Sequence, residues 1–373
     1  MQYSQLSQFS QQVHAGRPLP FNIYDHDRTL LLARGHLVAT PDQLQALLAR
    51  GALIDIAELQ TPAQRVKLAR PKELPGLWTD CSDKLANTLR SPTDEGFLDA
   101  LENHTPVAMA LVERDPDLAI FQVLRQDGNA HVQYGVNHSI HAAITAQLVA
   151  QRLGWSTDEA RRVFNAALTM NLAMLELQGR LAEQTTPLTE AQRADIQAHP
   201  ELSRMLLELS GVSDELWLQG VAQHHESPDG QGYPHGLREP GDIAMLIRRA
   251  DIYTAKLSPR AGRSAMAADQ AGRQMFMQDP GHPMTAALVK EFGVYPPGCW
   301  VRLASGECGL VVRRGPTVMA PVVSVMTSPQ GKFLPLPLRR DTHQKAYQVL
   351  QVLAAQDPRP KLPHALLMKL ALA

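Results

Sequence analysis

The residues with the clearest capacity for chemistry lie at 223–237, which read QHHESPDGQGYPHGL. Two adjacent histidines, His224 and His225, follow an apolar stretch, residues 216–221, that is typical of the body of a helix. The glycines and prolines that come next allow the chain to turn sharply. Two imidazoles beside such a turn can direct their nitrogens into one small volume, which suits a metal ion or a phosphate. A histidine-bearing surface loop is the alternative.

The order His-His-Glu-x-x-Asp-Gly-x-Gly-Tyr-Pro-x-Gly-Leu in this stretch resembles the signature of the HD-GYP family. This family is a branch of the HD metal-dependent phosphohydrolases, and its members typically hydrolyse cyclic di-GMP, a bacterial second messenger. The resemblance covers most of residues 120–330, strongly at 223–237 and weakly at 160–180. It implies a helical HD-type domain that acts in signal transduction.

Hydrolysis of a phosphodiester near neutral pH requires a strong nucleophile and neutralisation of the phosphoryl charge. Two metal ions about 3.5–4 Å apart can supply both. Imidazoles and carboxylates suit iron or manganese as ligands. The resemblance implies that five metal ligands of the family are present in this chain: His138, His199, His224, His225 and Asp251.

The family's His-Asp doublet, by contrast, is missing. Met170 stands in place of the histidine, Asn171 in place of the bridging aspartate, and Met174 in place of a lysine thought to bind or polarise phosphate. Tyr134 stands where members that bind a third metal have a glutamate. A thioether is too soft for a hard cation, and a neutral amide lacks the charge that holds two divalent ions together. No residue is therefore assigned a catalytic role.

Two outcomes remain open for the surviving ligands. One divalent ion, iron or manganese, could be held by three histidines, since three protein ligands plus water is a viable number. Alternatively no metal binds, and the histidines act as hydrogen-bonded core or pocket residues. The three histidines concerned are His199, His224 and His225.

The resemblance implies that this chain retains more of the family's nucleotide-facing residues than of its His-Asp doublet. Tyr233 and Pro234 match its turn, and Arg260 and Arg263 match the pair of basic residues that follows its aspartate helix, although Gly262 replaces an aromatic residue between them. Arginine forks suit phosphate oxygens and the guanine edge. A solvated basic face at a helix end is the alternative for the two arginines.

Composition limits the classes of partner and compartment. The net charge is −1, from 36 basic and 37 acidic residues, so no global positive field favours a nucleic-acid polymer. Three widely spaced cysteines match no metal pattern and fit a reducing interior. The first residues lack a secretory signal, and no stretch reaches the about 20 apolar residues of a membrane span. We expect a cytoplasmic protein without a membrane span.

The pattern along the chain predicts a mainly α protein of several parts. Residues 1–60 form a small α/β accessory domain, 61–76 a proline-containing linker, 77–290 the helical HD-GYP domain with its lead-in helices, and 291–373 a β-rich appendage with terminal helices. Helices are expected at 134–153 and 242–257, with another that continues through Leu172 and one that begins at Pro200 with His199 as its cap.

Three functions are compatible with this pattern. The first is a degenerate HD-GYP protein of cyclic di-GMP signalling, which senses the nucleotide or binds a signalling protein without efficient hydrolysis. The second is an active phosphodiesterase with a reduced metal site. The third is a structural scaffold that binds no nucleotide.

Overall fold

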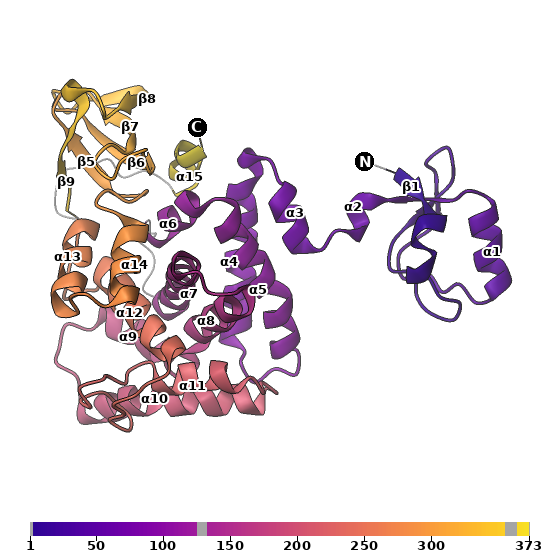
Figure 1. The fold of residues 1–373 in the computed structure, drawn as a ribbon, viewed down its shortest axis with the longest axis horizontal. Helices are drawn as coiled ribbons and strands as arrows, with labels where there is room; N and C mark the ends of the chain where they lie inside the picture. The colour runs from indigo at the N-terminus through magenta and orange to yellow at the C-terminus, as the bar shows by residue number, and fades with distance from the viewer. Residues whose placement is uncertain (1–2, 125–132, 355–363, 373) are drawn as a thin grey trace. The chain divides into compact units, whose positions relative to one another are not determined.

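The computed structural model describes residues 3–124, 133–354 and 364–372 (Figure 1). The chain forms two compact units, which divide after Ala69. Helices dominate the second unit, and each unit contains one small sheet. The protein is therefore mainly α with a sheet-containing C-terminal region, as the sequence predicts. No helix in the described part of the chain combines the length and hydropathy that crossing a bilayer requires.

The first unit is built on a four-stranded antiparallel sheet. Thr40 caps helix α1 (Pro41–Ala49), because its hydroxyl accepts from the N–H of Gln43. Leu37 forms only an isolated bridge with Pro18, since proline has no N–H with which to extend a ladder. The strand order is β1-β4-β2-β3, and the elements are β1 (Tyr3–Gln5), η1 (Leu6–Gln12), β2 (Ile23–Tyr24), β3 (Leu30–Leu32), α1 (Pro41–Ala49), β4 (Leu53–Asp55) and α2 (Ile56–Leu59).

The segment predicted as a linker, residues 61–76, is largely helical. Helix α3 (Pro62–Leu68) begins with a capping box, in which Thr61 and Gln64 each satisfy the backbone N–H of the other. Proline at the first helical position adds to this start signal. From the sequence, the prolines of this segment predict a linker. In the structure, Pro62, Pro71 and Pro75 lie in the first turns of α3, η2 (Pro71–Glu73) and α4 (Leu74–Arg90).

Helix α7 (Tyr134–Leu153) forms the centre of the helical domain. It is buried along most of its length, and α4, α8, α12 and α14 pack against it (Figure 1). Gly154 ends it in a left-handed conformation with φ 78°, as expected for a C-terminal glycine. The remaining helices of this domain are α5 (Phe97–Arg114), α6 (Pro116–Leu124), α8 (Thr157–Thr169), α9 (Leu175–Glu183), α10 (Glu190–Leu209), α11 (Glu215–Gln223), α12 (Asp242–Leu257), α13 (Ala268–Gln278) and α14 (Pro283–Phe292).

Two predicted helix boundaries are wrong. Helix α8 ends at Thr169, and a 3-10 turn, η3 (Leu172–Met174), follows, so the expected continuation through Leu172 does not occur. Helix α10 does not begin at Pro200 but runs through it. The serine Oγ of Ser203 on α10 accepts from the N–H of Ala173, which holds the η3 segment against that helix and favours the break after α8.

The C-terminal sheet is antiparallel with strand order β8-β7-β6-β5-β9. A hairpin turn at Ser305-Gly306 joins β5 (Trp300–Leu303) to β6 (Cys308–Arg313), with Trp300 opposite Leu310. Of the terminal helices expected after the sheet, the described part of the chain contains one, α15 (His364–Leu372). The elements are β5 (Trp300–Leu303), β6 (Cys308–Arg313), β7 (Val322–Thr327), β8 (Phe333–Asp341), η4 (Lys345–Tyr347), β9 (Val349–Val352) and α15 (His364–Leu372).

Ion pairs connect this sheet to the helices. At the end of β6, the Arg313 guanidinium lies 3.1 Å from the carboxylate of Asp115. The neighbouring Arg314 guanidinium reaches Asp117 and, at 2.7 Å, the Glu291 carboxylate. These carboxylates are largely buried, and pairs of this kind resist separation because a lone charge would remain in a poorly solvated place.

Candidate metal centre

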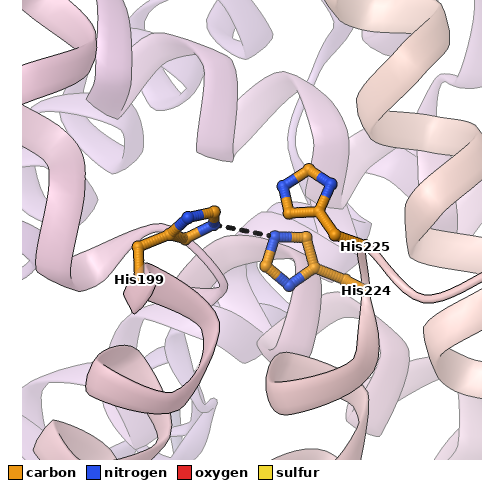
Figure 2. A group of neighbouring side chains, drawn as sticks. All are labelled: His199, His224 and His225. Atoms are coloured by element: carbon orange, nitrogen blue, oxygen red, sulfur yellow. Dashed lines mark hydrogen bonds between the residues drawn. The ribbon is translucent and has the colours of Figure 1, made fainter. Parts of the chain in front are cut away.

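Three histidine side chains converge from two helices that pack against each other. His199 lies in the middle of α10, while His224 and His225 follow the last turn of α11 (Figure 2). One ring nitrogen of each lies within 4.8 Å of the others. The shortest contact, the dashed line in Figure 2, joins Nε2 of His199 to Nε2 of His224 at 3.1 Å.

Hydrogen bonds to the backbone fix the tautomer of two of these rings. Nδ1 of His199 lies 2.6 Å from the Ile196 carbonyl oxygen, and Nδ1 of His224 lies 2.7 Å from that of Val221. A carbonyl can only accept, so each Nδ1 carries a proton. Burial, followed by the neighbouring His224 ring, lowers the pKa of His199 to about 3, and burial also lowers the pKa of His224. Both rings are therefore neutral, and each Nε2 presents a lone pair.

The facing lone pairs are the clearest sign of a cation site. Two unprotonated nitrogens 3.1 Å apart repel each other unless a cation lies between them. A proton on either Nε2 would leave the corresponding Nδ1 lone pair against a carbonyl oxygen. The separation is compatible with two imidazole nitrogens that each lie about 2.0–2.1 Å from one metal ion. His199, His224 and half-buried His225 therefore fit one divalent ion.

The carbonyls that orient the rings are free for a local reason. In a regular helix the Ile196 carbonyl would accept from the N–H of residue 200, but Pro200 has no N–H, and the His199 ring takes its place. Val221 lies in the last turn of α11, where carbonyls lack helical donors. Each carbonyl accepts from Nδ1 of one histidine, and this orients the Nε2 atoms of both rings toward the same point.

A second pair of expected ligands contact each other. Nε2 of His138, on α7, lies 2.6 Å from Oδ1 of Asp251, on α12. Burial alone would raise the pKa of the Asp251 carboxyl, but the His138 hydrogen bond and the nearby imidazoles outweigh it and hold that pKa well below its usual range. The ionised carboxylate accepts a hydrogen bond from the Nε2–H group, which leaves Nδ1 of His138 buried and without a hydrogen-bond partner in the part of the chain that the structure describes.

The turn after the histidine doublet is held by Glu226, a buried residue whose role sequence reasoning missed. Its two carboxylate oxygens accept from the N–H groups of His235 and Leu237, at 2.7 and 2.8 Å. At Gly232 a Cβ would lie 2.5 Å from the Glu226 Cα, so only glycine fits. Tyr233 stacks on His225, with ring centroids 4.5 Å apart. An acidic residue directly before a glycine-rich turn was the available signal.

Comparison with known proteins identifies related sequences. A family model described as an HD domain matches residues 101–279. Cyclic di-GMP phosphodiesterase PA4108 from Pseudomonas aeruginosa is 30% identical over 213 residues, 55% of this chain and 50% of that protein. The 3'3'-cGAMP-specific phosphodiesterase 3 from Vibrio cholerae serotype O1 is 28% identical over 235 residues, 62% of this chain and 47% of that protein. Residues 101–279 therefore match an HD domain, and the chain is similar to phosphodiesterases that act on cyclic dinucleotides.

The chain spans about half the length of these curated relatives. A solved structure titled Bd1817, a HDG"Y"P protein from Bdellovibrio bacteriovorus, aligns with a TM-score of 0.49 at 15% identity, covering 78% of this chain and 98% of that one.

The residues that the sequence analysis aligns with the His-Asp doublet are deeply buried. Met170 is 0% exposed and Asn171 1% exposed. Nδ2 of Asn171 has no hydrogen-bond partner among the described residues, which is unfavourable for a buried amide. Met174 lies at the end of η3, not on a continuation of α8, so it does not share a helical face with Met170.

The two arginines expected to face a nucleotide differ in their contacts. Nε of Arg260 donates to the Tyr134 hydroxyl at 2.9 Å, and its guanidinium lies 5.2 Å from the centre of that ring. The Tyr134 ring is nearly parallel to that of His138, with centroids 6.0 Å apart. Arg263 instead donates to the Ala255 carbonyl, near the end of α12. Arg260 is thus connected to the His138–Asp251 pair through Tyr134.

Proposed function

We propose that this chain is a degenerate HD-GYP protein of cyclic di-GMP signalling, which binds a cyclic dinucleotide or a signalling protein without efficient hydrolysis. The observation that carries the proposal is Asn171, a buried neutral amide where the family has its bridging carboxylate. Two divalent ions at close distance repel each other strongly, and a neutral amide does little to offset this. The relatives named for their activity on cyclic di-GMP or 3'3'-cGAMP support a cyclic dinucleotide as the ligand.

One divalent ion, iron or manganese, would be held by His199, His224 and His225. When bound, such an ion would attract a phosphate and neutralise part of its charge. The protein's own residues contribute fixed groups around it. Tyr233 covers one face of the His225 ring, and Arg260 is an exposed cation held in place by Tyr134.

Contacts from the other expected nucleotide residues are less direct. Pro234 follows Tyr233 in the turn clamped by Glu226, so it would shape the pocket beside the stacked ring. Arg263 would have to release the Ala255 carbonyl before it could reach a phosphate. We therefore assign Arg260 the larger contribution to nucleotide affinity.

A phosphodiesterase with a reduced metal site is the second candidate. The facing Nε2 atoms of His199 and His224 favour it, because they fit an ion that could activate water as well as bind phosphate. Loss of the second ion removes charge stabilisation worth several kcal/mol, so a rate at least about 10³-fold below that of a two-metal site is expected.

Two measurements on the purified chain separate these functions. Metal content after anaerobic purification should be at most one ion per chain, and calorimetric titration with cyclic di-GMP and 3'3'-cGAMP should show binding without product. Binding should weaken in Arg260→Ala and persist in Lys332→Ala, which removes an exposed cation from the C-terminal sheet. Turnover at ordinary enzyme rates that is lost in His224→Ala would favour the phosphodiesterase. Absence of any nucleotide binding would leave the scaffold function.

A further inference from the structure

A cleft of about 740 Å³ lies between helices α13 and α14 and the loop that joins β6 to β7. None of the three converging histidines lines it. Its walls include the aromatic side chains of Phe276 and Tyr295 together with several basic groups. Small-molecule sites typically have volumes of about 300–1,000 Å³, apolar or aromatic walls and a few placed polar groups. The cleft matches that description.

The basic groups of the cleft are of two kinds. Arg152 and Arg314 are already paired with the Glu291 carboxylate. Arg273 and Lys290 are exposed, and neither forms an ion pair with a described residue. Two cations that form no ion pair with a described residue, beside a partly enclosed space, attract an anion, since charges at such a surface interact more strongly than in bulk water.

Asp269 adds the opposite chemistry within the same cleft. Its Oδ1 is buried and accepts no hydrogen bond from the described residues. A buried acceptor without a donor is unfavourable, and an N–H from a ligand would satisfy it. A lipid anion would satisfy the two cations of the cleft, but its hydrocarbon chain has no N–H group to donate to Asp269. The ligand should therefore carry a donor at one end and a negative charge at the other.

Helix α13 presents these groups along one face, because Asp269, Arg273 and Phe276 are spaced by four and three residues. Between them lies Gly272, which is buried, yet a Cβ added there would meet no atom within 4 Å. The surface of α13 thus has open room beside an acceptor, a cation and an aromatic ring.

We propose that this cleft binds a nucleoside monophosphate, as a site separate from the histidine cluster. The flat ring packs against Phe276 and Tyr295 and donates an N–H to Asp269, while the phosphate faces Arg273 and Lys290. Aromatic side chains stack with any base because every base has a π-face, and guanidinium and ammonium groups form charge-assisted hydrogen bonds with phosphate.

The test is calorimetric titration of the full chain with GMP, with guanosine and ribose 5-phosphate as probes that lack the phosphate or the base. GMP should bind saturably, and each fragment should bind at least about 10-fold more weakly, because each loses one half of the contacts. Gly272→Leu should abolish GMP binding by filling the open room, and it should not weaken α13, since leucine favours helix more than glycine does. Met277→Ala, an exposed neighbour outside the cleft, is the matched control.

His225→Ala distinguishes this site from the proposed nucleotide function of the histidine cluster. GMP affinity that is unchanged in His225→Ala and reduced about 10-fold in Arg273→Ala would support the cleft. The reverse pattern, with loss in His225→Ala and none in Gly272→Leu or Arg273→Ala, would overturn it and place the nucleotide at the histidines. Absence of GMP binding to the unaltered chain would also overturn it, whatever the histidine cluster binds.

Discussion

The Nε2 atoms of His199 and His224 face each other at 3.1 Å, and neither carries a proton. Each ring is held in this state by a backbone carbonyl that accepts from its Nδ1. The repulsion between the two lone pairs is built into the fold, so a cation that binds there gains affinity without rearranging either ring. This preorganisation is the strongest reason to expect that a metal site survives the loss of the His-Asp doublet.

A divalent ion should accordingly stabilise the folded protein. At 100 times its dissociation constant, a ligand that binds only the native state adds about 2.7 kcal/mol to the free energy of unfolding. We expect Mn²⁺ to raise the melting temperature of the unaltered chain and to have little effect on His199→Ala, as measured by calorimetry. His235→Ala, which removes an exposed histidine outside the cluster, should respond like the unaltered chain. An equal response from His199→Ala would show that the ion binds elsewhere.

Pro200 should contribute to metal affinity although it cannot touch a metal. In Pro200→Ala the new N–H can donate to the Ile196 carbonyl, and it then competes with Nδ1 of His199. Changes in groups that orient a metal ligand typically lower affinity about 10–100-fold. We expect a loss in that range by metal titration, while the free energy of unfolding is unchanged or higher, because alanine suits a helix interior better than proline. Unchanged metal affinity would mean that the carbonyl accepts both donors.

Glu226 should prove structural. Both of its carboxylate oxygens accept backbone N–H groups of the turn, and glutamine would oppose one of them with its own amide hydrogens. A buried N–H group that loses its hydrogen-bond acceptor costs about 1–3 kcal/mol of stability. Glu226→Gln should lower the free energy of unfolding by this amount in urea titrations, whereas Glu201→Gln, a change at a more exposed carboxylate, should have a much smaller effect. Equal effects of the two variants would contradict a clamping role.

Local signals account for the parts of the fold that sequence reasoning predicts well. Helices α7 and α12 are predicted to the residue, because Gly154 and the long apolar periodicities act within each segment. The histidine doublet is likewise a local pattern. Pro200 leads to the wrong helix start because proline is common at the first position of a helix. In the helix interior it leaves the Ile196 carbonyl without a backbone donor, and here the His199 side chain donates instead.

Contacts between distant segments explain the remaining misses. Glu226 accepts from residues nine and eleven positions further along, and the end of α8 depends on Ser203 of α10. The residues around Glu226 do not indicate which N–H groups it accepts from, and the residues around the end of α8 do not indicate the contact with Ser203. The cleft beside α13 is formed by four segments between residues 152 and 321, and nothing in the sequence pattern indicates that they meet.

The missing doublet can be tested by replacing it. Met170→His with Asn171→Asp should raise the metal content from one ion to two per chain, because it restores the imidazole and the bridging carboxylate that the HD-GYP resemblance implies at these positions. The double variant should be less stable than the unaltered chain without metal, since a buried aspartate is then uncompensated, and should regain stability when Mn²⁺ or Fe²⁺ is added. Met170→His with Asn171→Leu has a similar volume but no charge and is the matched control.

Addition of Met174→Lys to the metal-restored variant should bring back some turnover of cyclic di-GMP. Helical spacing does not place Met174 beside Met170, because Met174 lies in η3 after a break in the helix; the residue is 7% exposed. A lysine there must extend toward the site, since a buried ammonium without a partner is costly. Restored metal without turnover would locate the remaining defect among the nucleotide contacts, with Gly262 the first position to change. A folded double variant that takes up no second ion would show that the pocket around Met170 has closed on the methionine side chains, which adapt readily to irregular spaces.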